Sequence, residues 1–74
     1  MSELLQNLGG AVRAARERRG WTQAALAELA GLERTYLTDL EAGRRNPSVR
    51  TLEKISKALG IKLHVLFERA ERET

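Results

Sequence analysis

Apolar residues recur at steps of three and four along most of the chain, with charged residues between them. This spacing places the apolar side chains on one face of an α-helix, and it predicts five short helices. The segments are separated by glycine and proline, at Gly20, Gly31, Gly43, Pro47 and Gly60. Because no segment shows the period-two alternation of a strand, the pattern predicts an all-α fold.

The first segment contains a glycine pair inside its helical pattern. Its apolar face is formed by Leu5, Leu8, Val12 and Ala15. Gly9 and Gly10 each weaken a helix by about 1 kcal/mol relative to alanine when they lie in its interior. We therefore expect these glycines to permit close packing against a neighbouring element.

The next two segments have the proportions of a helix-turn-helix over about residues 22–42. Thr22 is a suitable N-cap for a helix that runs to about Ala30, and Gly31 is suited to end that helix in a left-handed turn. A third helix is predicted from about Arg34 to Ala42. The predicted inward positions are Leu26, Leu29 and Ala30 in the second helix, and Leu37 and Leu40 in the third.

A fourth helix is predicted between the N-cap Ser48 and Gly60, and a fifth over about residues 62–72. The inner face of the fourth helix is predicted to be Leu52, Ile55, Ala58 and Leu59. A domain of this size cannot easily bury the apolar residues of the fifth helix, Leu63, Leu66 and Phe67, in one core. We expect these three to form a homodimer contact; the alternative is that they close the core of the monomer.

Length and composition exclude several classes of protein. With 74 residues, we expect one domain over 1–74 without a deep catalytic pocket, so an enzyme is not expected. The absence of cysteine excludes disulfides and cysteine-rich zinc sites, and it favours a cytoplasmic location. No apolar run approaches the ~20 residues of a membrane span. No metal or cofactor is expected, and the net charge of +3 is only weak evidence for a polyanion partner.

Four motifs, in this order and spacing, resemble the Xre, Cro and lambda-repressor-like helix-turn-helix family. They are Gly-Trp-Thr-Gln at 20–23, Leu-Ala-Glu-Leu-Ala-Gly-Leu at 26–32, Leu-Glu-Ala-Gly at 40–43 and Asn-Pro-Ser at 46–48. The run Glu33-Arg34-Thr35-Tyr36-Leu37, followed by Arg45-Asn46, is most similar to the controller proteins of restriction-modification systems. The resemblance implies a compact five-helix domain that binds double-stranded DNA.

The resemblance also implies which side chains face the bases. The third helix of this family enters the major groove, which would turn Arg34, Thr35, Thr38 and Asp39 toward base edges. Arg34 is suited to guanine, since a guanidinium can bond O6 and N7 together. The alternatives are a solvated Arg34 and an Asp39 that orients Arg34 or Arg44.

A second set of residues would hold the DNA backbone: Gln23, Tyr36, Arg44, Arg45, Asn46 and Thr51. Gln23 lies at the positive end of the second helix, where a phosphate is favoured. The alternatives are a surface glutamine, a solvated 44–46 loop and a Tyr36 that packs in the core.

The family places an ion pair between the first helix and the end of the third, at Arg16 and Glu41. We interpret this pair as structural. Trp21 is interpreted as a packing residue beside the cap, and the single His64 as an exposed side chain.

The resemblance thus implies a sequence-specific transcriptional regulator that binds a pseudo-palindromic operator as a homodimer, and the likeness to controller proteins implies that it controls its own restriction-modification operon. Contact with RNA polymerase through acids such as Glu28 and Glu33 is a further hypothesis. The alternative is an antitoxin or another protein-interaction module of the same fold. A local basic face of Arg34, Arg44 and Arg45 is expected, with acids of the tail, Glu68, Glu71 and Glu73, lowering the net charge from the far end.

Overall fold

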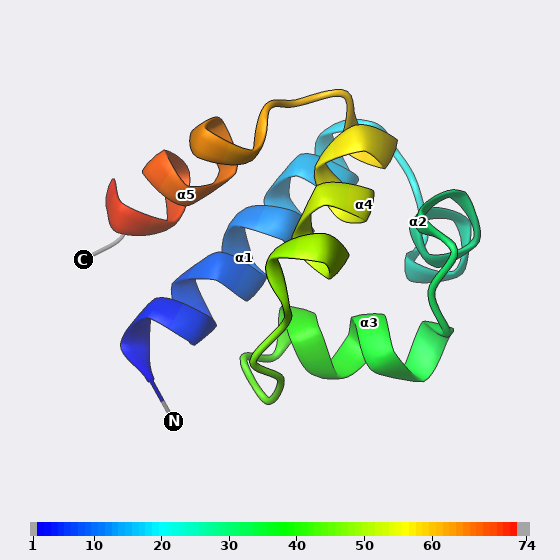
Figure 1. Cartoon of the computed structure of the whole chain (residues 1–74). Helices are drawn as coiled ribbons and strands as arrows, with labels where there is room; N and C mark the ends of the chain where they lie inside the picture. Colours follow the sequence, from blue (N-terminus) through cyan, green and yellow to red (C-terminus); the bar gives the residue numbers. More distant parts are fainter. Residues whose placement is uncertain (1, 73–74) are drawn as a thin grey trace.

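The computed structural model describes residues 2–72 and contains five helices, with no strand in that range. The helices are α1 (Glu3–Arg18), α2 (Gln23–Ala30), α3 (Arg34–Glu41), α4 (Val49–Leu59) and α5 (Leu63–Arg72). Helix α1 packs against α5, α3 and α4, and α2 packs against α3 and α4. In Figure 1, α5 lies beside α1 at one end of the fold, and α2 and α3 lie at the other. This arrangement confirms the predicted all-α, five-helix fold. Within residues 2–72, no helix has the length and apolar character needed to cross a membrane.

Local chemistry sets the helix boundaries where the sequence predicted them. The Thr22 hydroxyl accepts a hydrogen bond from the Ala25 backbone N–H at 3.1 Å, and the Ser48 hydroxyl accepts one from the Thr51 N–H at 3.1 Å. Gly31 ends α2 at a φ of 70°, a conformation that glycine adopts without steric cost. Helix α3 begins at Arg34 without a side-chain cap from the preceding Glu33.

The inward face of α2 differs from the prediction at one position. Leu26, Ala27 and Ala30 are buried, but Leu29 is 60% exposed. Each residue turns the helix by about 100°, so the three buried residues share a face from which Leu29 points away. The prediction for Leu29 is wrong because α2 packs between α3 and α4, which shifts the buried face toward Ala27.

Helix α5 divides its apolar residues between the core and the surface. Leu66 has no exposed area and, with Ala70 one turn later, completes the core beneath α1. Leu63 and Phe67 pack against the core but stay partly exposed. Leu66 is therefore corrected from a dimer contact to a core residue of the monomer, which is the alternative considered for this group. Leu63 and Phe67 are still accessible to a second copy.

The close approach of α1 to α3 depends on Gly9. A Cβ built on Gly9 would lie 2.6 Å from the backbone oxygen of Glu41 and would also overlap the backbone oxygen of Leu40. A Cβ on Gly10 would meet nothing within 4 Å. The prediction of close packing is thus confirmed for Gly9 alone, and this contact sets how near the end of α3 lies to α1.

Candidate nucleic-acid interface

Helix α3 lies at the edge of the fold (Figure 1). One of its faces is polar and open to solvent. Arg34 and Thr35 in its first turn are exposed, whereas Thr38 and Asp39 in the next turn are half-buried. The opposite face is fixed in the core by Leu37 and Leu40, which are 0% and 2% exposed. Because the helix is anchored along one side, the four polar side chains project together from the other.

A buried ion pair holds the end of α3 against α1. Arg16 donates from Nε to one carboxylate oxygen of Glu41 at 2.8 Å and from Nη2 to the other at 2.9 Å. Arg16 also donates from Nη1 to the Trp21 carbonyl at 2.8 Å, which ties the pair to the start of α2. The side chains of Arg16 and Glu41 are only 10% and 3% exposed. The pair is the one that the family resemblance implies.

The hydrogen bonds to Glu41 raise the pKa of the Arg16 guanidinium above its ordinary value. This pKa is already far above neutrality, so Arg16 is charged at every pH at which the domain would be studied. A guanidinium has no acceptor atoms. Arg16 is therefore a fixed donor at this site.

Gln23 connects the ion pair to the exposed face of α3. Its Nε2 donates to Glu41 Oε1 at 3.0 Å, and its Oε1 accepts from the Thr38 hydroxyl at 2.9 Å. We call this set of four residues, Arg16, Glu41, Gln23 and Thr38, the hydrogen-bond relay. The relay was not predicted from the sequence.

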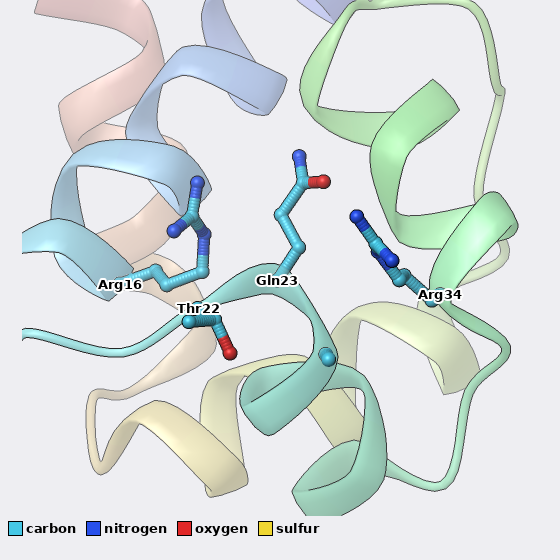
Figure 2. Close-up of a pocket in the computed structure, with 5 residues that line it drawn as sticks. Arg16, Thr22, Gln23 and Arg34 are labelled. Atoms are coloured by element: carbon cyan, nitrogen blue, oxygen red, sulfur yellow. The ribbon is translucent and has the colours of Figure 1, made fainter.

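An open recess of about 440 Å³ adjoins the relay, lined by Arg16, Thr22, Gln23, Ala24 and Arg34. Figure 2 shows the Gln23 side chain standing between those of Arg16 and Arg34. The backbone N–H groups at the start of α2 lie beside it, and the positive end of the α2 dipole favours an anion there. Gln23 and Arg34 contribute N–H donors to the lining of this recess, and phosphate oxygens accept hydrogen bonds from such groups.

The loop after α3 carries two arginines that fold back onto the helix. Asp39 forms ion pairs with Arg44 and Arg45, with Nε to carboxylate oxygen distances of 3.5 and 3.8 Å. Within residues 2–72 its ion pairs are with these two arginines rather than with Arg34. Arg45 also stacks over the ring of Tyr36, 5.1 Å from its centroid, and Tyr36 packs on the core. Asp39 and Tyr36 thus hold the loop arginines beside the exposed face of α3.

Asn46 and Thr51 are the remaining residues predicted to contact the DNA backbone. Asn46 is exposed, and Thr51 is half-buried, with its hydroxyl accepting from Ser48 at 3.0 Å.

Glu68 and Glu71 lie on α5, and Glu73 lies outside the described residues. Arg34, Arg44 and Arg45 are exposed around α3, so the cationic side chains gather where the sequence predicted.

A family model described as helix-turn-helix matches residues 12–66, which include the whole of α2, α3 and α4. The chain belongs to the helix-turn-helix family. In this helix-turn-helix domain, α2 and α3 are the two helices joined by the turn at Gly31.

Relatives of this helix-turn-helix domain include two curated proteins. The chain is 46% identical over 59 residues to the immunity repressor protein of Bacillus phage phi105, covering 80% of this chain but 41% of the repressor. It is 43% identical over 58 residues to the control protein C.MunI of a Mycoplasma species, covering 78% of each chain. The domain thus spans less than half of the phage repressor but most of the control protein.

A solved structure shows the same fold over nearly the whole chain. The restriction-modification controller protein C.Esp1396I, solved as a tetramer in complex with its natural 35 base-pair operator, is 34% identical. It superposes with a TM-score of 0.89 over 99% of this chain and 96% of its own. The likeness therefore extends from the helix-turn-helix to α5.

The side-chain contacts of Gln23 and Asp39 in this helix-turn-helix domain are only partly indicated by the sequence. The position of Gln23 at the start of α2 predicts a phosphate contact, and nothing in the sequence indicates that its amide reaches Glu41, 18 residues away. The pairing of Asp39 with Arg44 is one of the alternatives that the sequence predicts, whereas its second partner, Arg45, is not among them. The short sequence distance from Asp39 to the two loop arginines indicates these ion pairs only weakly.

Proposed function

We propose that this helix-turn-helix domain is a sequence-specific regulator of transcription that binds double-stranded DNA as a homodimer, in the manner of restriction-modification controller proteins. The main supporting observation is the exposed polar face of α3, fixed from behind by Leu37, Leu40 and the buried Arg16–Glu41 pair. C.Esp1396I, with the same fold, was solved in complex with its operator. A regulator of this kind acts on DNA in the cytoplasm.

In the proposed complex, α3 lies in the major groove and its first two turns face the bases. Arg34 lies at the N-terminus of α3, where its positive charge interacts unfavourably with the helix dipole. Hydrogen bonds to the acceptors O6 and N7 of guanine would offset this unfavourable interaction. Thr35 is beside it, and Thr38 and Asp39 lie one turn further along the same face. These four residues are proposed to provide the sequence preference.

The DNA backbone is proposed to be held at two places on either side of α3. Gln23 and the start of α2 would take one phosphate in the recess. Arg44, Arg45, Asn46, Tyr36 and Thr51 would take others. Each neutralised phosphate releases counterions, so the affinity is expected to fall steeply as salt rises.

The proposed homodimer uses α5, where Leu63 and Phe67 remain partly exposed. A two-fold axis through this face would separate the two α3 helices by one turn of DNA, about 34 Å, so that both enter successive major grooves. The operator would then be pseudo-palindromic. Contact with RNA polymerase through the exposed acids Glu28 or Glu33, and control of the regulator's own operon, belong to the same proposal.

Replacing Arg34 by alanine tests base readout. We expect Arg34→Ala to weaken binding to the preferred duplex by about 1 to 3 kcal/mol while weak, salt-sensitive binding persists. Arg34 is exposed and leaves no cavity, so the thermal unfolding midpoint should not fall. A competition titration between the preferred duplex and a scrambled one measures the discrimination. Unchanged discrimination would remove Arg34 from the readout.

Replacing Phe67 by alanine tests the dimer. We expect Phe67→Ala to shift the protein toward monomer at micromolar concentration, because it removes the largest apolar side chain of the proposed contact. Sedimentation velocity measures the shift. Val49→Ala is the matched control, since Val49 is a 65% exposed apolar residue on α4, outside this contact. A dimer that persists in Phe67→Ala at the same concentration would contradict the α5 interface.

A further inference from the structure

Arg16 determines which atoms donate and which accept hydrogen bonds along the relay. Arg16 can only donate, and both of its bonds to Glu41 consume carboxylate lone pairs. Glu41 Oε1 also accepts from Gln23, and an ionised carboxylate can only accept. The Gln23 amide must therefore turn its NH₂ group toward Glu41, because the reverse orientation would set two acceptor oxygens against each other.

The orientation of Gln23 in turn fixes the Thr38 hydroxyl. With Nε2 directed at Glu41, the amide oxygen of Gln23 is what faces Thr38, at 2.9 Å from Oγ1. The other neighbour of Oγ1 is the carbonyl oxygen of Arg34, at 3.0 Å. Both neighbours are acceptors, so the single hydroxyl hydrogen of Thr38 is used inside the protein whichever of them it selects. What Thr38 offers outward is lone pairs alone.

We infer that Thr38 meets DNA solely as a hydrogen-bond acceptor, and that it selects a base with an exocyclic amino group in the major groove, N6 of adenine or N4 of cytosine. This inference rests on the proposed function. It restricts the Thr38 hydroxyl to accepting hydrogen bonds from DNA, although a threonine hydroxyl can in general both donate and accept. A free threonine hydroxyl could equally donate to guanine or to thymine O4. Arg16, Glu41 and Gln23 are positioning residues for this selection.

The experiment compares the wild type with Thr38→Val and Thr38→Ser on the duplex that the wild-type protein selects from a random pool. Valine has nearly the shape of threonine without the oxygen, whereas serine keeps the hydroxyl. Valine should remove the preference at one base pair in each half-site, and serine should retain it. Thermal unfolding checks that both variants fold, and Thr38→Ala replaces valine if valine does not.

Base analogues at that base pair then show whether Thr38 accepts or donates a hydrogen bond there. Purine in place of adenine, or 2-pyrimidinone in place of cytosine, deletes the amino group. This deletion should lower wild-type affinity about tenfold and the affinity of Thr38→Val by less than twofold. A 7-deazapurine in the same base pair removes an acceptor instead, and it should lower the affinities of both proteins by the same factor.

Two results would overturn the inference while leaving the proposed function intact. One is an unchanged consensus, or a uniform loss of affinity for every sequence, in Thr38→Val. The other is a selective loss with the 7-deazapurine, which would show that Thr38 donates. If the wild-type protein enriches no sequence from the pool, the proposed function itself fails, and the two failures are thereby distinguished.

Discussion

Replacing Gly9 by alanine is expected to lower the free energy of unfolding by about 3 kcal/mol. The added methyl group would overlap the backbone oxygens of Leu40 and Glu41, and backbone cannot rotate away as a side chain can. A 74-residue domain has a total stability of about 4 to 11 kcal/mol, so this change would remove much of it. Chemical denaturation followed by circular dichroism measures the loss.

Gly10 offers a matched control one residue away in the same helix. A Cβ there meets nothing within 4 Å, so Gly10→Ala should gain the helix propensity of alanine, about 1 kcal/mol, at no packing cost. The two variants should thus move stability in opposite directions. Similar effects of both would mean that the close approach of α1 to α3 does not occur in solution.

Replacing Glu41 by alanine is expected to cost about 3 to 5 kcal/mol. The substitution leaves the Arg16 guanidinium buried, charged and without its carboxylate partner, and it also removes the acceptor of Gln23 Nε2. The loss should appear as a lower midpoint in thermal or denaturant unfolding. Part of the destabilisation comes from the orphaned charge and is not the net contribution of the pair.

Two further variants separate the cost of the unpaired Arg16 charge from the net contribution of the ion pair. Glu17→Ala breaks the exposed Arg13–Glu17 pair, whose side chains are 62% and 55% exposed, and should change stability by less than about 1 kcal/mol. The double variant Arg16→Met with Glu41→Leu removes both charges and should be more stable than Glu41→Ala. If Glu41→Ala is as mild as Glu17→Ala, the pair is not buried in solution.

The helix boundaries could be predicted because they depend on local chemistry. Thr22, Ser48 and Gly31 act on their own backbone or on residues three positions away, and all three take the roles predicted for them. The clustering of cationic side chains around α3 was also predictable, because the residue that begins this helix and the loop that follows it are close in sequence.

What could not be predicted depends on how the helices meet. Leu29 fits a helical apolar stripe, and only the placement of α2 between α3 and α4 turns it outward. Leu66 and Phe67 are adjacent in sequence, yet only Leu66 enters the core completely. The relay joins residues from α1, α2 and α3, and its direction follows from atoms that are brought within 3.0 Å by the fold.

In the proposed function, a dimer of this domain reads a specific DNA sequence with α3. Selection of bound duplexes from a random pool by the wild-type protein shows whether this readout occurs. We expect a two-fold symmetric consensus whose half-sites are separated by about one helical turn, roughly 10 base pairs. Recovery of a pool without enrichment, or of a consensus without two-fold symmetry, would contradict it.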